Sequence, residues 1–298
     1  KDPVVFASEN TAQVARNRAM HANIRQLVAE GKSIEDIAKE KFQYTTELLR
    51  GIIVDAMEKI GPPPADFEWL GTGSLGLGIP TDYSDLESLF IMATKPGDPN
   101  YAAHRDYFEL LAALVFMAVI NLGETEPRTM DFRRVATITE ERAPVPKGLA
   151  FDGQMPSACQ SPLGNRHHLM RADDANAKDL IGDASRIAAN IVGEGESKLR
   201  MLSVLCNTCT LYRHGDRDLR QDLRKAIDAI LILPAGDADR NKSFPFHLGT
   251  QRHRVFIQLM QHAVYEFEPQ VGKHTSEGHR FSPKFDFYRL YIFISHLS

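Results

Sequence analysis

The sequence predicts an α+β fold, with helical segments at both ends of the chain and a strand-rich part between them. Apolar residues recur at helical spacing over residues 9–60 and again beyond about residue 170. Short apolar runs of strand length, separated by glycine and proline, occupy residues 67–152. We therefore expect a mixed sheet with flanking helices, preceded by N-terminal helices and followed by a C-terminal helical bundle.

Two changes of pattern divide the chain into three predicted segments. Residues 1–60 form an N-terminal helical segment, in which Gly31 separates two helices and a triple proline that begins at Pro62 follows the second. Residues 61–168 form the core, and residues 169–298 form a C-terminal helical domain. In the core we expect strands near 67–72, 86–92, 130–138 and 148–152, and helices after Ser74 and near 103–119.

Five helices are expected in the C-terminal segment, because its apolar residues recur every three or four positions. They are predicted over 177–192, from a cap at Ser197 to about Arg213, and over 218–233, 255–267 and 285–297.

Composition limits the classes of protein to which the chain can belong. The net charge of −4 and the isoelectric point near 6.3 argue against an extended nucleic-acid-binding surface. No apolar run reaches the roughly 18 residues of a membrane-spanning helix, and no signal peptide is visible, so we expect no membrane association and a cytoplasmic location. The first residue is Lys1 rather than Met, which is typical of a piece of a longer or delivered protein.

The three cysteines do not form a disulfide framework, since their number is odd in a large chain. Cys206 and Cys209 have the spacing of half a zinc site, but no second pair of ligands follows them. A buried helix is the preferred interpretation of that segment.

A glycine-serine turn followed by two carboxylates is the most informative motif. Gly73 and Ser74 follow a strand-like segment, and Asp85 and Glu87 precede the next one. Backbone N–H groups in such a turn can point at the phosphates of a nucleoside triphosphate. Alternate residues of a strand face the same side, so the two carboxylates can share one site. Oxygen ligands on one face favour Mg²⁺, with Mn²⁺ as the alternative, and the ion would orient the triphosphate.

The residues around this motif resemble those of the DUF294 nucleotidyltransferase domain, which is related to the N-terminal domain of PII uridylyltransferases. The family belongs to the DNA polymerase β-type nucleotidyltransferase superfamily. The resemblance covers about residues 45–165. Residues 80–87 are similar to the family's "TPYSDLE" segment, residues 119–125 to a "VINLGET" element, and residues 148–164 to a "GFAFDGxMPxACKTPxG" element. The resemblance implies a nucleotidyltransferase-type mixed sheet and a helical part after the core that helps to hold substrate.

Three positions depart from the family pattern. Leu77 and Ile79 stand where the family often has Arg and Glu inside the glycine turn, and Gln160 stands where the narrower branch often has Lys. Two positive charges that could contact phosphate are therefore absent.

Sites of this kind usually need a third carboxylate, and two candidates are present. Asp131 and Asp152 both lie in strand-like settings. The resemblance favours Asp152, because it lies in the matching "FDG" element, where it would complete the metal site or accept the proton of an attacking hydroxyl. Of the adjacent Arg133 and Arg134, one could clamp phosphate, and we assign Arg133 to nucleotide binding.

Together these features predict a metal-dependent nucleotidyltransferase that moves AMP or UMP from ATP or UTP to a hydroxyl and releases pyrophosphate. Asp85, Glu87 and Asp152 would hold the metal ions, and Gly73, Ser74 and Arg133 the nucleotide. The acceptor is expected to be a protein, because the resembling enzymes of known activity modify regulatory proteins.

Three other interpretations remain open. A catalytically silent nucleotide-binding regulatory module would account for Leu77, Ile79 and Gln160. A metal-dependent glycosyltransferase also uses paired acids, although the glycine-serine turn so close before them argues against it. A purely structural interaction protein would leave Asp85 and Glu87 without a role.

Overall fold

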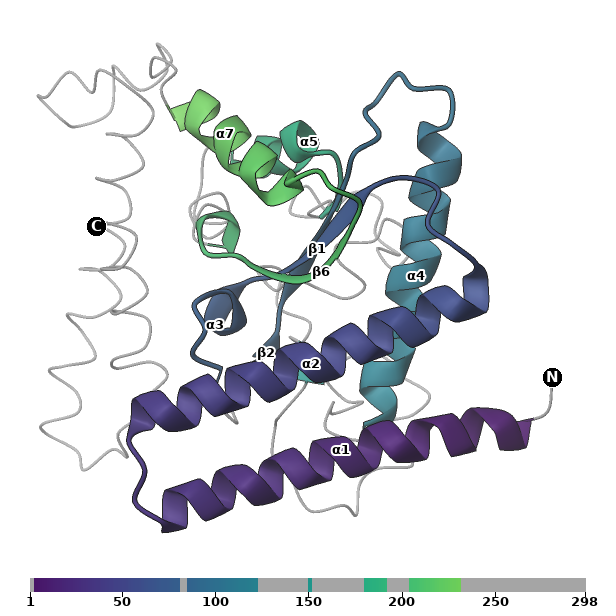
Figure 1. Ribbon diagram of the computed structural model, residues 1–298. Helices are drawn as coiled ribbons and strands as arrows, with labels where there is room; N and C mark the ends of the chain where they lie inside the picture. The colour runs from purple at the N-terminus through teal and green to yellow at the C-terminus, as the bar shows by residue number, and fades with distance from the viewer. Residues whose placement is uncertain (1–2, 81–84, 123–149, 152–179, 192–203, 232–298) are drawn as a thin grey trace, which may run out of the picture. The chain divides into compact units, whose positions relative to one another are not determined.

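The computed structural model describes residues 3–80, 85–122, 150–151, 180–191 and 204–231 (Figure 1). The chain forms two compact units, one of residues 1–187 with 207–222 and the other of residues 188–206 with 223–298. The described residues of the candidate site all belong to the first unit, which is α+β as predicted.

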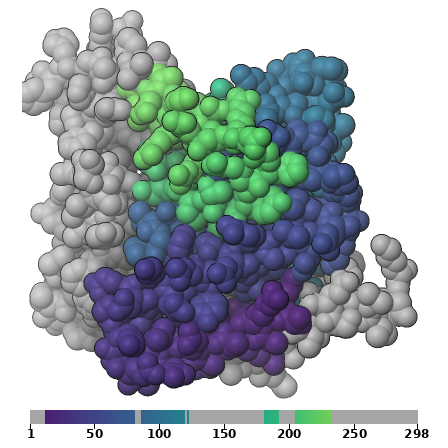
Figure 2. Space-filling view, in the orientation of Figure 1, coloured from purple at the N-terminus to yellow at the C-terminus, as the bar shows by residue number. Residues whose placement is uncertain are grey.

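Two long helices begin the first unit, α1 (Pro3–Ala29) and α2 (Ile34–Ile60), and they pack along each other (Figures 1 and 2). Ser33 caps α2: its hydroxyl accepts a hydrogen bond from the Asp36 N–H at 3.1 Å. The helix ends at Gly61, whose φ of 95° breaks the helical path while its N–H donates to the Met57 carbonyl. The predicted N-terminal helices, with their separation near Gly31, are thus confirmed.

The sheet of the first unit has four strands in the order β5-β3-β1-β6. β1 (Phe67–Gly71) is central and pairs antiparallel with both β3 (Ser88–Met92) and β6 (Cys209–His214). β5 (Ile181–Gly182) pairs parallel with β3, so the sheet is mixed, as predicted. Gly71 at the end of β1 is opposite Ser88 at the start of β3, which places the turn after β1 beside the residues that precede β3.

A second, two-stranded sheet lies at those residues. β2 (Asp85–Leu86) runs parallel to β4 (Ala150–Phe151), with Asp85 opposite Ala150 and Leu86 opposite Phe151. The predicted strand over 86–92 is therefore two strands, β2 and β3, and Glu87 is the residue between them.

Aromatic side chains build the core on one face of the main sheet. The Phe67 and Phe90 rings stack with centroids 4.7 Å apart, and Phe108 of α4 (Tyr101–Asn121) lies within 5.1 Å of both. All three residues are fully buried. Burial of an aromatic side chain stabilises a fold by about 1.5–3 kcal/mol, so this cluster holds α4 firmly against β1 and β3.

Two helix predictions for the C-terminal segment are wrong in part. The helix expected to run to about Arg213 is replaced from Cys209 onward by β6, where pairing with β1 outweighs local helical spacing. Within the helix expected over 177–192, residues 181–182 form β5, and only the shorter α5 (Ala184–Ala188) and η3 (Ala189–Ile191) follow. Two strands of the core sheet thus come from a segment for which only helices were predicted.

The other predicted elements are confirmed where they can be compared. The expected strand near 67–72 is β1, the helix near 103–119 is α4, and the helix over 218–233 is α7 (Leu219–Leu231). The short helix after Ser74 is α3 (Gly73–Gly76), which begins one residue earlier. The strand expected near 130–138 and the helices expected over 255–267 and 285–297 lie outside the described residues, as does the C-terminal bundle that the last two would complete. No helix in the described part of the chain is long and apolar enough to cross a membrane.

Candidate active site

The glycine-serine turn follows β1 directly and is held by hydrogen bonds within its own backbone. α3 is a single helical turn, in which the Gly76 N–H donates to the Thr72 carbonyl at 2.9 Å and the Ile79 N–H donates to the Ser74 carbonyl at 2.9 Å. Gly73 has a φ of 57°, in the left-handed region that favours glycine. The N–H groups at the start of this turn are therefore held in fixed directions at the end of the central strand.

Glu87 lies against this turn. Its backbone carbonyl accepts a hydrogen bond from the Thr72 N–H at 3.0 Å, which joins the two segments beyond the β1–β3 ladder. A Cβ atom on Gly73 would collide with the Glu87 carboxylate. The positive φ favours glycine at position 73, and the Glu87 carboxylate lies close against it, so the turn and one of the two predicted carboxylates lie together.

Asp85 is the first residue of β2. Its backbone is in β2, two residues before Glu87, but its side chain lies outside the described part of the structure. The parallel pairing of β2 with β4 places Phe151 beside Leu86. Glu87 is the residue that follows β2, and Asp152 is the residue that follows β4. Asp152 itself is outside the described residues.

The remaining predicted site residues cannot be placed. Arg133 and the alternative third acid Asp131 lie outside the described residues, as does Gln160. Within the described residues no group of three or more His, Cys, Asp or Glu side chains is arranged to hold a metal ion. The full carboxylate set proposed from the sequence therefore stays a prediction.

Two hydroxyl groups stand at the turn. Ser74 is buried. Thr72 is 1% exposed, and its Oγ1 has no hydrogen-bond partner among the described residues. A buried polar atom without a partner costs about 1–3 kcal/mol, so this turn carries unused hydrogen-bonding capacity. Thr72 was missed by the sequence analysis because nothing in its type or spacing separates it from an ordinary residue before a turn.

The turn also differs from a typical phosphate-binding loop in its side chains. Leu77 and Ile79 are half-buried, as is Gly78 between them. None of the three supplies a charge, so the turn offers backbone N–H groups and hydroxyls to an anion.

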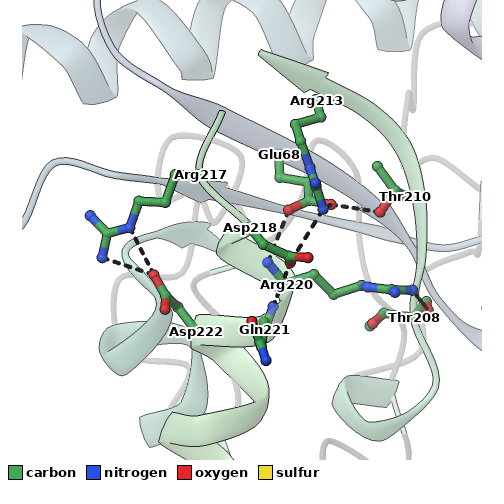
Figure 3. Close-up of polar contacts among 9 residues, drawn as sticks. All are labelled: Glu68, Thr208, Thr210, Arg213, Arg217, Asp218, Arg220, Gln221 and Asp222. Atoms are coloured by element: carbon green, nitrogen blue, oxygen red, sulfur yellow. Dashed lines mark hydrogen bonds and ion pairs between the residues drawn. The ribbon is translucent and has the colours of Figure 1, made fainter. Parts of the chain in front are cut away.

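A buried polar cluster supports β1 beside the site, and it too was missed (Figure 3). Glu68 of β1 is wholly buried and accepts three hydrogen bonds: from Thr210 Oγ1 at 2.5 Å, from Arg213 Nη2 at 3.0 Å and from the Arg220 backbone N–H at 2.9 Å. The bond to Glu68 raises the pKa of the Arg213 guanidinium. No sequence pattern marks Glu68, because it lies in an otherwise apolar strand and its partners are more than 140 residues away.

Asp218 completes this cluster at the start of α7. Its Oδ1 accepts the Gln221 N–H at 2.8 Å, and this bond is the main reason that the pKa of Asp218 lies below its usual value. The same oxygen lies 3.2 Å from Arg213 Nη2. The first turn of α7 is thus held to β1 and β6 through Arg213 and Glu68.

Neither of the two described cysteines is part of a disulfide. Cys206 is exposed, whereas Cys209 is half-buried at the start of β6. Burial is the largest effect on Cys209 and raises the pKa of its thiol to about 11. With no further ligands near them in the described residues, the spacing of this pair gives no support for a zinc site.

Comparison with known proteins adds a family to this geometry. Residues 18–127 match the family model described as putative nucleotidyltransferase DUF294. This part of the chain is therefore similar to that family. The resemblance stated from the sequence is confirmed, and it supports a general nucleotidyltransferase function. The DUF294 match includes the glycine turn, β2, β3 and α4, and ends before β4, β5 and β6. No curated protein matches the chain.

Proposed function

We propose that this chain is a metal-dependent nucleotidyltransferase that moves AMP or UMP from a nucleoside triphosphate to a hydroxyl group on a protein. The observation that carries the proposal is the contact between the Glu87 carboxylate and Gly73. It joins an acidic group to a turn of oriented N–H groups within a DUF294-type segment. An anionic substrate and a cation that neutralises it need this combination of donors and acceptors.

The turn would bind the triphosphate. The N–H groups at the start of α3 and the Ser74 hydroxyl would donate to phosphate oxygens. The Thr72 hydroxyl is a further donor, and it has no partner among the residues that the structure describes. Because the turn is closed by its own hydrogen bonds, little reorganisation is needed when the substrate binds. We assign Arg133 to the nucleotide as well.

Asp85, Glu87 and Asp152 would hold Mg²⁺, with Mn²⁺ as the alternative. The pairing of β2 with β4 supports this set, because it aligns the chain just before Asp152 with the chain just before Glu87. A bound Mg²⁺ would orient the triphosphate and neutralise charge on its oxygens. The Glu87 carboxylate at the turn fits such an ion, since hard cations prefer oxygen ligands.

The reaction is an in-line displacement. The acceptor hydroxyl oxygen would form a bond to the α-phosphorus while the bond from that phosphorus to the bridging oxygen breaks. Pyrophosphate leaves with the electron pair of the broken bond. Asp152 is the carboxylate that we assign to accept the hydroxyl proton.

A double substitution tests the proposal. Asp85→Ala with Glu87→Ala should abolish transfer of label from an α-labelled nucleotide, because both assigned metal ligands are removed. Glu47→Ala with Glu58→Ala is the matched control, since it also removes two carboxylates, but from the exposed side of α2. Melting temperatures equal to that of the unchanged protein would show that both double variants still fold. Transfer of label by the Asp85→Ala, Glu87→Ala variant would contradict the proposal.

A silent nucleotide-binding module is the second candidate. It is favoured by Leu77 and Ile79, which leave the turn without a charged side chain. Such a module would show a higher melting temperature with Mg-nucleotide but no release of pyrophosphate.

A further inference from the structure

The chain that enters β6 lies across the glycine turn. Residues 207–209 are called the strap here. A Cβ atom on Gly76 would collide with the carbonyl oxygen of Asn207 and would lie 2.8 Å from its carbonyl carbon. A Cβ atom on Gly71 would lie 3.1 Å from Cys209 Sγ. The strap therefore packs closely against Gly71 at the end of β1 and against Gly76 of the turn, where the Asn207 backbone leaves no room for a side chain.

Arg220 holds the strap in this position (Figure 3). Its Nη1 donates to the Thr208 carbonyl at 3.2 Å. Its own backbone N–H donates to Glu68 at 2.9 Å, and Glu68 is wholly buried in the central strand. The position of the Arg220 backbone is thus fixed by the core, while its side chain reaches out to the strap.

Arg213 and Thr210 complete the support. Both donate to the other oxygen of Glu68, at 3.0 and 2.5 Å, and both belong to β6, which continues the strap. Glu68 therefore connects the strand that leads into the glycine turn with the strand that follows the strap and with the helix that carries Arg220.

From these contacts we infer that Arg220 is a positioning residue for the glycine turn, acting through the Thr208 carbonyl and the strap rather than by touching the nucleotide. The inference rests on the proposed function for its effect on nucleotide binding, but its mechanical part does not. A turn confined on one side by the strap keeps its N–H groups aligned before the substrate arrives, which reduces the ordering needed on binding.

Hydrogen exchange of the turn amides tests the mechanical part. The N–H groups of residues 76–79 are bonded within the turn, so their exchange reports how often it opens. Arg220→Ala removes the bond to Thr208 but keeps the backbone N–H that Glu68 accepts. We expect about 2- to 10-fold faster exchange, the range that corresponds to loss of one ordinary hydrogen bond. Arg220→Lys, which keeps a donor on a long stem, should restore slow exchange in part.

Arg217→Ala is the matched control. Arg217 lies three residues before Arg220 and makes an exposed ion pair with Asp222 at 2.8 Å. Its removal takes away the same charge without changing the bond to Thr208, so the turn amides should exchange as in the unchanged protein. Equal exchange in Arg220→Ala and Arg217→Ala would overturn the inference.

Nucleotide affinity separates this inference from the proposed function. With Mg-ATP and Mg-UTP as probes, Arg220→Ala should raise the Kd of the bound nucleotide several-fold, with a melting temperature close to that of Arg217→Ala. One outcome is that the turn amides exchange faster in Arg220→Ala while the unchanged protein binds no nucleotide. That outcome would contradict the proposed function and would support the mechanical role of Arg220. Unchanged exchange together with unchanged affinity would contradict the role of Arg220 and leave the proposed function standing.

Discussion

At the scale of single residues, Glu68 shows how an acid can belong in a hydrophobic core. Burying a carboxylate is costly unless its lone pairs are used, and here three donors use them. Two of the donors belong to the strand that pairs with Glu68's own strand, and the third to the start of α7. The residue therefore connects β1 with β6 and the start of α7, which lie more than 140 residues further along the chain.

Glu68→Gln should lower the free energy of unfolding by about 1–3 kcal/mol. The substitution replaces one accepting carboxylate oxygen by an amide N–H₂ group, which would face an N–H or O–H donor and could not accept its hydrogen bond. Glu58→Gln, at an exposed position of α2, should change it by less than about 0.5 kcal/mol. Urea unfolding of both variants measures the difference. Equal stability of the two variants would contradict the role given to Glu68.

Cys209 should be a slow nucleophile at neutral pH, since its thiol has a pKa of about 11. In a variant in which Cys159 and Cys206 are changed to Ser, its rate of alkylation by iodoacetamide should keep rising with pH beyond pH 9. In urea the same thiol should reach its plateau near its ordinary pKa. A plateau below pH 9 in the folded protein would show that the thiol is not shielded.

The same shift has a consequence for stability. A thiol whose pKa is raised on folding keeps its proton longer in the folded state than in the unfolded state. Its contribution is therefore present below the ordinary pKa of 9.0 and is lost as the pH rises from 9.0 towards about 11.

At the scale of elements, the turn and the strap depend on each other. Gly76→Ala should destabilise the fold by about 1–3 kcal/mol, because its methyl group meets the Asn207 carbonyl. Gly51→Ala in α2 should be neutral or stabilising by up to about 1 kcal/mol, since the nearest atom to its Cβ, Arg16 Nη1, is 3.9 Å away and alanine favours a helix. Thermal unfolding compares the two, and a Gly76 variant as stable as the Gly51 variant would contradict the packing of strap on turn.

Elements whose ends are set by neighbouring residues in the sequence could be predicted. Gly31 and the triple proline that begins at Pro62 were the stop signals read from the sequence, and α1 and α2 end within two residues of them. The Gly73–Ser74 turn and the separation of Glu87 from it by a short connection were likewise visible in the sequence, because glycine spacing and strand length are local properties.

Long-range pairing explains what the sequence did not predict. Residues 209–214 were assigned to a helix, but their structure is set by β1, which lies some 140 residues earlier. No local sequence pattern identifies Glu68 or Thr72. Glu68 is recognised by its hydrogen bond with the distant Arg220, and Thr72 by the absence of a partner for its hydroxyl among the described residues. The neighbourhood of β2 and β4 depends in the same way on a pairing between distant segments.

At the scale of the whole molecule, the first unit collects its sheet from three parts of the chain. β1 and β3 lie in the DUF294-type segment, whereas β5 and β6 come from residues beyond it. Residues 18–127 therefore hold the turn and the predicted pair of carboxylates, but the sheet that supports them needs the later strands. We expect that a fragment ending at residue 127 would lack a stable core, because β1 would lose its pairing with β6 and Glu68 all three of its donors.

The most direct test of the proposed function is to incubate the whole chain with Mg²⁺ and each of the four α-labelled nucleoside triphosphates, with and without a cell lysate, and to follow label and pyrophosphate together. The proposal predicts label on a protein from ATP or UTP, with pyrophosphate released in equal amount and both lost in the Asp85→Ala, Glu87→Ala variant. Neither label nor pyrophosphate from any of the four nucleotides, with a folded protein, would contradict it.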